Sequence, residues 1–293
     1  MKVLGTGLSG LVGTRIADLL SSSFEFSDLS KTTGVDITDY RLLQEKISQS
    51  DAPWIFHFAA YTDVQGAEKE RELGEKSIAW NVNVIATGYI ADIAKATDKR
   101  VLYLSTDYVF DGTKPSPYSE DDRPNPVGWY ATTKYEGEKR IMALGESGCV
   151  IRISNPYRSF PVGKKDWVHK IVERLEGGLP VASPTDSLFC PTHIDDLAGA
   201  IAAIVKSNGN GIFHVVSREG LTPFDASGAI AKQWNFPLDQ VGKTVYDQFY
   251  VGRAKVHKNG VLSHSRIEAL GVCLHSFQEG IQTVYNQEHG LVS

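Results

Sequence analysis

The feature that most constrains the fold of this chain is a glycine-rich turn close to its start. Gly7, Gly10 and Gly13 lie between an apolar segment, residues 2–4, and a segment, residues 11–20, in which apolar residues recur at helical spacing. Glycines at such a place permit a tight turn, a close approach of backbone to a ligand, and close packing of helix on strand. The free N–H groups at the start of the helix attract phosphate. We therefore predict a strand–turn–helix unit that binds the pyrophosphate of a dinucleotide.

The first half of the chain alternates segments that favour strands with segments that favour helices. Strands are predicted at residues 24–29, 53–60, 100–104 and 149–153, and helices at residues 40–47, 78–95 and 129–144. Such alternation implies right-handed crossovers. We therefore expect an α/β fold with a doubly wound parallel sheet of the Rossmann type.

The pattern loosens after about residue 155. Helices are predicted at residues 166–175, 195–207, 224–234 and 281–287, and one further strand at residues 211–216. We expect a Rossmann domain of residues 1–155 that also receives part of residues 185–215. Residues 156–293 are expected to form a smaller, mostly helical C-terminal substrate lobe, so that the two units are interleaved along the sequence.

Composition excludes several functional classes. The 293 residues carry a net charge of −5 without a basic stripe, so we expect no nucleic-acid partner. The longest apolar runs have the length of strands, which argues against a membrane partner. Cys149, Cys190 and Cys273 lack metal-ligand spacing, so we expect no metal site and no disulfide framework. These features favour a cytoplasmic protein.

The end of the second strand should contact the adenosine ribose of the cofactor. Asp28 is placed to accept hydrogen bonds from the 2′- and 3′-hydroxyls, which favours NADH. Ser30 and Lys31 could instead hold a 2′-phosphate, which favours NADPH. Asp36 and Ile37 follow the next turn and are candidates for contact with the adenine, with a helix-capping loop as an equal alternative.

Tyr130 and Lys134 are four residues apart in a predicted helix and therefore share one face. An adjacent ammonium group favours the phenolate and lowers the pKa of a tyrosine. A tyrosine tuned in this way can pass a proton to a carbonyl oxygen near neutral pH. Tyr135 and Lys139 have the same spacing, so spacing alone does not identify the catalytic pair.

Thr106 lies just after the fourth predicted strand, where hydroxyl groups face the ligand crevice of a parallel sheet. Its surroundings complete a set of motifs that resembles the extended short-chain dehydrogenase/reductases, and more narrowly the dTDP-4-dehydrorhamnose reductase family. The segments that carry this resemblance are residues 6–13, 34–39, 58–64, 83–87, 105–112, 117–122 and 130–138, with a weaker match at residues 191–198.

The resemblance implies a catalytic triad of Thr106, Tyr130 and Lys134. Thr106 would hydrogen-bond the substrate carbonyl, and Tyr130 would donate the proton as hydride arrives from the nicotinamide. Lys134 would lower the pKa of Tyr130 and hold the nicotinamide ribose. The residues expected to bind NADPH or NADH are Gly7, Ser9, Gly10, Leu11, Gly13, Asp28, Ser30, Lys31, Asp36, Ile37, Ala59, Ala60, Tyr61, Asn83, Tyr130 and Lys134.

The reaction implied by the resemblance is the NAD(P)H-dependent reduction of the 4-keto group of a nucleoside-diphosphate sugar. Tyr108, Asn155 and Arg158 are the residues expected to contact this substrate. Trp129 and Trp167 are candidates for the walls around a nucleotide base.

The second half of the chain departs from the family pattern at two places. Residues 154–158 are closer to the Asn-x-Tyr of nucleotide-sugar epimerases and dehydratases, and residues 255–257 replace an expected Arg-Pro pair. Two alternatives therefore stay open. The first is a nucleotide-sugar epimerase or another ketoreductase of the same fold. The second is a non-catalytic, cofactor-binding regulatory subunit that resembles the β-subunit of methionine adenosyltransferase. A homodimer is possible in either case.

Overall fold

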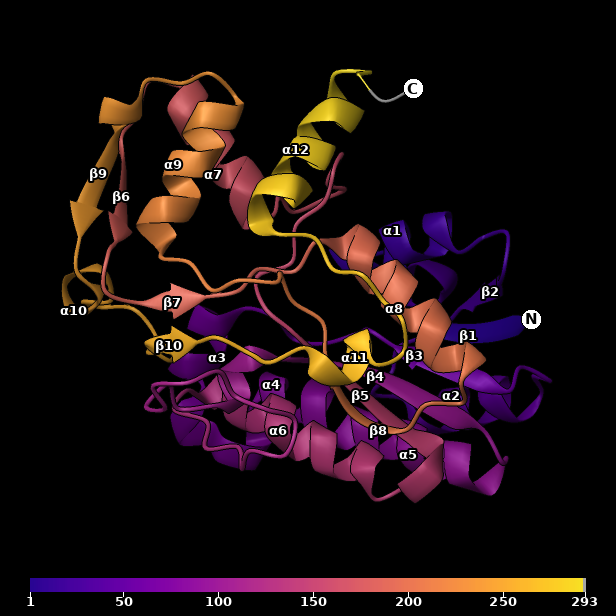
Figure 1. The fold of residues 1–293 in the computed structure, drawn as a ribbon. Coiled ribbons are helices and arrows are strands. Elements are labelled where there is room, and N and C mark those ends of the chain that lie inside the picture. The colour runs from indigo at the N-terminus through magenta and orange to yellow at the C-terminus, as the bar shows by residue number, and fades with distance from the viewer. Residues whose placement is uncertain (292–293) are drawn as a thin grey trace.

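The computed structural model describes residues 1–291, and its centre is one parallel sheet with the strand order β2-β1-β3-β4-β5-β8 (Figure 1). The strands are β1 (Lys2–Thr6), β2 (Glu25–Asp28), β3 (Trp54–His57), β4 (Arg100–Thr106), β5 (Gly148–Ile153) and β8 (Gly211–His214). The direction of strand addition reverses at β1, because β2 lies on one side of it and β3 on the other. Ligands bind at such switch points in open α/β sheets. The predicted doubly wound Rossmann-type sheet is confirmed.

Helices cover both faces of this sheet (Figure 1). One face carries α1 (Leu11–Leu19), α8 (Ile194–Lys206) and the short α11 (Ser265–Glu268), and the other carries α2 (Tyr40–Ser48), α5 (Ala86–Ala96) and α6 (Trp129–Met142). Successive residues of β3 alternate between the two cores: Trp54 and Phe56 pack with α1 and α8, whereas Ile55 packs with α2 and α5. This double burial explains why the strand is apolar throughout.

Residues 194–214 belong to the sheet layers although they come late in the chain. The helix α8 lies against α1, and β8 pairs with β5, from Cys149 opposite Gly211 to Arg152 opposite His214. Part of the segment 185–215 therefore joins the unit formed by the first half of the chain. The division of the chain at residue 155 stays a prediction.

The predicted helix at residues 78–95 is one helical run with a change of pitch in its middle. It consists of α4 (Ile78–Trp80), a π-helical segment (Asn81–Ile85) and α5. Asn83 in the π segment is buried, and its side-chain amide exchanges two hydrogen bonds with the backbone of Tyr61, at 2.8 and 3.1 Å. It also donates to Thr133 Oγ1 in α6 at 2.9 Å. Wide helical turns of this kind are rare and occur often near functional sites.

The C-terminal lobe lies to one side of the sheet, at the upper left of Figure 1. Its main helices are α7 (Trp167–Glu176), α9 (Pro223–Gln233) and α12 (Phe277–Glu288), which pack around Tyr157. The lobe also contains elements that the sequence pattern did not predict: β6 (Val181–Pro184) paired with β9 (Val241–Thr244), β7 (Leu188–Phe189) paired with β10 (Asn259–Gly260), and α10 (Tyr246–Phe249). Segments of two to four residues are too short to show a periodicity.

Within residues 1–291, no helix combines the length and the apolar character that crossing a membrane requires. Cys149 and Cys190 are buried, Cys273 is exposed, and all three are free thiols. The cytoplasmic location and the possible homodimer stay predictions.

Candidate active site

The glycine turn after β1 is packed so tightly that side chains are excluded. Gly7 has a φ of +71°, which glycine adopts without strain, and a Cβ atom on it would lie 2.5 Å from the backbone nitrogen of Ala59. A Cβ atom on Gly13 would lie 2.2 Å from the carbonyl oxygen of Gly7. Gly10 precedes α1 without a side-chain cap, so the first N–H groups of α1 remain available. This open helix start, next to an exposed Ser9, fits a pyrophosphate.

The turn of β1 also brings the residues after β3 into the site. Ala59, Ala60 and Tyr61 are half-buried and follow β3 directly, beside Gly7. Asn83 fixes the backbone of Tyr61. The predicted cofactor residues of the β1 turn and of the segment after β3 are thus neighbours.

Asp28 lies at the end of β2 with one oxygen unsatisfied. Its Oδ2 atom accepts a hydrogen bond from Ser30 Oγ at 2.7 Å, whereas Oδ1 is buried and has no partner among the described residues. Buried carboxylate oxygens normally have partners, and a ribose hydroxyl would supply one. Lys31 is exposed and forms an ion pair with Asp36 at 3.1 Å. The residues of this turn therefore fit the adenosine end of NADH or NADPH.

Asp36 and Ile37 serve the loop that leads into α2. Asp36 Oδ1 accepts hydrogen bonds from the backbone and the hydroxyl of Thr38, at 3.0 and 2.8 Å, and these bonds lower the pKa of Asp36. Ile37 is buried, and Asp39 caps α2. This geometry favours the helix-capping alternative, and contact of these residues with adenine stays a prediction.

Thr106 ends β4, and a buried carboxylate stands beside it. Thr106 Oγ1 donates to Asp107 Oδ1 at 3.1 Å, and Ser154 Oγ donates to Asp107 Oδ2 at 2.7 Å. His257 Nε2 lies 3.2 Å from the same Oδ2 atom. The same groups affect Tyr130. Burial raises the pKa of Tyr130, the Asp107 carboxylate raises it further, and the hydrogen bond with the Thr106 hydroxyl lowers it in part.

The pKa of Tyr130 is raised and Lys134 is not among the groups that shift it, so the lowering expected from Lys134 stays a prediction. The ammonium of Lys134 donates to the carbonyl oxygen of Leu104 at 2.8 Å and lies 3.9 Å from the centre of the Tyr103 ring. Burial lowers the pKa of Lys134 to about 7, although Glu138 acts against the change. Its positive charge still helps burial to lower the pKa of His57.

The second tyrosine–lysine pair lies apart from this cluster. The ring of Tyr135 packs against the core that contains Phe110 and Tyr118. Lys139 lies over that ring at 4.5 Å and pairs with Glu136 at 2.6 Å. Tyr135 therefore belongs to the packing of α6.

Two buried polar groups support the sheet beneath the site. Arg152 and Glu138 form a bidentate ion pair, at 2.9 and 2.7 Å, and both are almost fully buried. Arg152 is therefore unavailable to a substrate phosphate. His57 in β3 contacts Thr6 Oγ1 at 2.7 Å and Thr87 Oγ1 at 3.0 Å, and burial lowers its pKa to about 3. It is a hydrogen-bonded core histidine.

A cavity of about 240 Å³ opens between the sheet and the C-terminal lobe. Its walls include Tyr108, Asn155, Trp167, Tyr246, Tyr250 and His257. Tyr108 and Asn155 are where the sequence placed substrate contacts. Asn155 has a φ of +39°, and its carbonyl oxygen accepts a hydrogen bond from Trp167 Nε1 at 2.7 Å. Such strained backbone concentrates at binding sites.

Arg158 and Trp129 are not among the residues that line this cavity, and their contact with a substrate stays a prediction. Arg158 is buried against α1, where its guanidinium donates to Leu11 O at 3.2 Å and to Thr14 Oγ1 at 2.7 Å. Trp129 stacks on Trp80 with ring centres 5.7 Å apart. Both side chains thus have partners within the protein.

Sequence reasoning did not identify Asp107, His257, Tyr246 or Tyr250 as part of the site. The only sequence feature that drew attention to His257 was the replacement of an expected Arg-Pro pair by residues 255–257. That feature did not indicate what His257 does. Tyr246 begins a helix of four residues that no periodicity marks, and Tyr250 follows the end of that helix.

The motifs, the switch-point turn and the residues around Thr106 agree with one family, whose model, described as the RmlD substrate binding domain, matches residues 1–289. The chain belongs to this family. A dTDP-4-dehydrorhamnose reductase of Mycolicibacterium smegmatis is 30% identical over 230 residues, which cover 78% of this chain and 68% of that protein. The resemblance to extended short-chain dehydrogenase/reductases of the dTDP-4-dehydrorhamnose reductase type is confirmed.

Two further proteins are similar to most of this chain. The methionine adenosyltransferase 2 subunit beta of Mus musculus is 28% identical over 284 residues, covering 92% of this chain and 83% of that protein. A crystal structure of dTDP-4-dehydrorhamnose reductase from Bacillus anthracis in complex with NADP is 26% identical, with a TM-score of 0.88 and coverage of 98% of this chain and 99% of that one. The chain is therefore similar both to reductases and to a protein named as a subunit of a different enzyme.

Proposed function

We propose that this protein reduces the 4-keto group of a nucleoside-diphosphate sugar with NADPH or NADH, as a dTDP-4-dehydrorhamnose reductase does. The observation that carries the proposal is the grouping of Thr106 and Tyr130 near the cavity that Tyr108 and Asn155 line, at the strand ends served by the glycine turn. Membership of the RmlD family and the similarity to a reductase in complex with NADP support it.

The cofactor would be held by the two tight glycines and by Asp28. Gly7 and Gly13 bring backbone to the pyrophosphate, and the unsatisfied Oδ1 of Asp28 accepts from the adenosine ribose. When bound, the nicotinamide supplies the hydride that reduces the carbonyl carbon. Ser30 and Lys31 offer a hydroxyl and an ammonium for a 2′-phosphate, so NADPH is compatible with the same turn.

Thr106 and Tyr130 act on the carbonyl oxygen of the substrate. The Thr106 hydroxyl orients that oxygen, and Tyr130 transfers its phenolic proton to it as the carbon is reduced, which gives the alcohol. The raised pKa of Tyr130 keeps the phenol protonated at neutral pH before the reaction. The resulting phenolate is a strong base and takes a proton back from water.

The cavity walls suit a sugar nucleotide. Tyr108, Trp167 and Tyr250 present flat apolar faces on which a base or a sugar ring can stack. Lys258 contributes an ammonium group to the lining, where it pairs with Asp186 at 2.7 Å. A diphosphate would compete for this ammonium.

The direct test is the oxidation of NADPH or NADH in the presence of a dTDP-4-keto-6-deoxyhexose, followed by absorbance of the reduced nicotinamide. We expect consumption of one cofactor per sugar reduced, with dTDP-linked sugars preferred over other nucleotides. Absence of consumption with every 4-keto sugar nucleotide would refute the proposal. An epimerase would convert its substrate without net cofactor consumption, because its hydride is returned.

A second candidate function is favoured by one observation, the match of 92% of the chain to a methionine adenosyltransferase subunit. A regulatory subunit would copurify with an enzyme partner and alter that partner's activity. In that case Tyr130→Phe would leave the effect on the partner unchanged. The reductase proposal is preferred because Thr106, Tyr130 and Lys134 are all present around one site.

A further inference from the structure

A buried histidine at the start of α8 lacks hydrogen-bond partners. His193 is the residue before α8, only 2% exposed, and neither of its ring nitrogens has a partner among residues 1–291. Its ring stacks on Tyr157, with centres 5.4 Å apart and planes 26° apart. Neutral imidazole carries one donor and one acceptor, and buried polar groups are almost always satisfied. His193 is therefore an exception that calls for a ligand.

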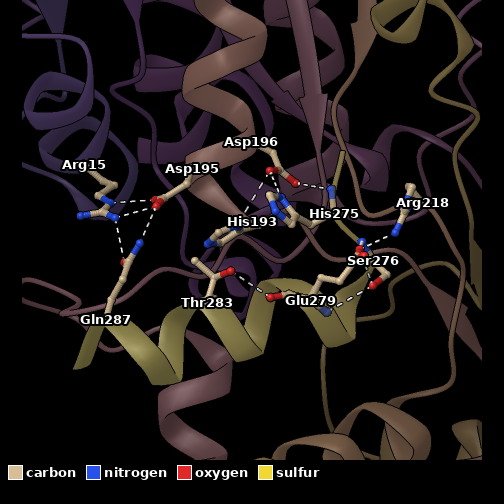
Figure 2. A network of polar contacts seen from close by, with 10 residues as sticks. All are labelled: Arg15, His193, Asp195, Asp196, Arg218, His275, Ser276, Glu279, Thr283 and Gln287. Carbon is tan, nitrogen blue, oxygen red and sulfur yellow. Dashed lines mark hydrogen bonds and ion pairs between the residues drawn. The ribbon is translucent and has the colours of Figure 1, made fainter. Parts of the chain in front are cut away.

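Two further side chains face His193 (Figure 2). Asp196 lies one turn later in α8, with Oδ1 3.8 Å from Nδ1 of His193. His275 lies just before α12, with Nδ1 2.5 Å from the same Oδ1 atom, and its backbone N–H donates to Asp196 Oδ2 at 2.9 Å. The two histidine rings are 5.7 Å apart and nearly perpendicular. One ligand atom from each of the three residues lies within 4.8 Å of the others.

We propose that His193, Asp196 and His275 bind a divalent transition-metal ion, with Zn²⁺ as the best-matched ion. Two imidazole nitrogens and one carboxylate oxygen are donors that zinc accepts, whereas calcium and magnesium prefer all-oxygen sites. Tetrahedral zinc with bonds of about 2.0–2.1 Å sets its ligand atoms about 3.3 Å apart. The distance of 3.8 Å between Nδ1 of His193 and Oδ1 of Asp196 is near this value.

The distance between Oδ1 of Asp196 and Nδ1 of His275 is only 2.5 Å. It has to increase by less than about 1 Å for both atoms to bind one zinc ion. His275 can move, because its side chain is 46% exposed. The same exposure leaves the fourth zinc position open to water. His193, by contrast, is held in place by Tyr157.

The metal would join the two parts of the molecule. Asp196 is in α8, which packs on the Rossmann sheet, and His275 lies two residues before the start of α12 in the C-terminal lobe. The same two elements are already connected nearby, because Arg15 of α1 donates to Asp195 Oδ2 at 2.6 Å and to Gln287 Oε1 at 2.9 Å (Figure 2). The ion would add a second, stronger link between α8 and α12, independent of the proposed reductase reaction.

The test is a titration of the full, tag-free, chelator-treated protein with ZnCl₂, followed by calorimetry and by thermal unfolding. We expect one Zn²⁺ per chain and a higher Tm with the ion. His275→Ala and Asp196→Asn should each weaken binding by more than about 100-fold, beyond the effect of losing an outer-shell partner. His289→Ala is the matched control, because His289 is an exposed histidine at the end of α12.

Cys273 provides the decisive control, since it is an exposed thiol two residues before His275. Cys273→Ser should leave zinc binding intact, and His193→Gln should remove it while circular dichroism shows a folded protein. If Cys273→Ser removes binding and His193→Gln does not, the ion sits on the surface thiol and the proposal is overturned. Absence of stoichiometric binding to the unsubstituted protein would also overturn it, leaving a hydrogen-bonded His–Asp–His group. Co²⁺ should bind to the same three residues and give the visible absorption of a four-coordinate site.

Discussion

The Nε2 atom of His257 lies 3.2 Å from Oδ2 of Asp107, and both side chains are buried next to Thr106. The C-terminal part of the chain thus contributes a side chain to the group that surrounds the proposed proton donor. Asp107 is the centre of this group, because it also accepts hydrogen bonds from Thr106 and Ser154. Its charge is one of the reasons why the pKa of Tyr130 is raised.

Asp107→Asn should lower the pKa of Tyr130, since the substitution removes a negative charge and keeps an oxygen that Thr106 can bond. We expect the alkaline limb of the pH profile of kcat to move to lower pH by about one unit. Asp121→Asn is the control, because Asp121 is exposed and pairs with Arg266. An unchanged alkaline limb in the Asp107 variant would mean that the carboxylate does not act on the proton donor.

Tyr130→Phe should reduce turnover by about 10²- to 10⁴-fold, the usual contribution of a positioned proton donor. Binding of NADPH or NADH, measured by fluorescence quenching, should change little, because the aromatic ring remains. Tyr135→Phe, five residues later in α6, should keep nearly full activity. Equal losses in the two variants would contradict the assignment of Tyr130.

Gly13→Ala should disrupt the cofactor turn, whereas Gly10→Ala should be mild. The added Cβ atom would lie 2.2 Å from the carbonyl oxygen of Gly7 at the first position but 3.3 Å from it at the second. Overpacking of this kind costs about 1–3 kcal/mol, and the displaced turn should weaken cofactor binding at least about tenfold. Thermal unfolding and cofactor titration measure the two effects separately. Similar behaviour of the two variants would show that the turn is not close-packed.

His169 should make stability depend on pH on the alkaline side. Burial alone would lower its pKa, but hydrogen bonds to Asp166 and Glu288 outweigh burial and raise the pKa to about 9. The stabilisation from protonated His169 is therefore complete below about pH 6.5 and disappears as the pH rises through 9, with an upper limit of about 3 kcal/mol.

His169→Gln should remove this pH dependence. Denaturant unfolding at pH 6 and pH 10 gives the free energies to compare, and the difference between them should shrink in the variant. His289→Gln serves as the exposed-histidine control. A difference of the same size in the unsubstituted protein and in His169→Gln would exclude His169 as its source.

The predictable parts of the fold are those whose structure is indicated by the residues of one short segment alone. Residues 100–104 and 129–144 were predicted as strand and helix because their apolar and polar residues recur with the right period, and β4 and α6 lie there. The turn at Gly7 and Gly13 was predictable for a similar reason, since Gly7 has a positive φ and Gly13 has no room for a side chain. The positions of Tyr108 and Asn155 on the cavity followed from the family resemblance.

The parts that were not predictable depend on residues far apart in the sequence. Nothing near residue 257 indicates that His257 reaches Asp107, and β6 pairs with β9 only after the lobe has folded. The pKa of Lys134 also depends on residues distant in the sequence. Helix spacing predicted that Lys134 lies near Tyr130, but the burial that lowers the pKa of Lys134 comes from the strands beneath α6. The contacts of Arg158 were not predictable either, because its partners in α1 lie more than a hundred residues earlier.

The late position of β8 and α8 in the sequence has a consequence for how the protein is made. Until residues 194–214 leave the ribosome, β5 presents a bare edge and the apolar face beside α1 is uncovered. Exposed edges and apolar faces on a nascent chain invite aggregation. We therefore expect that the N-terminal half cannot complete its fold until the rest of the chain is made, and that chaperones protect it until then. A truncation at residue 155 should be insoluble despite containing nearly all of the cofactor motifs.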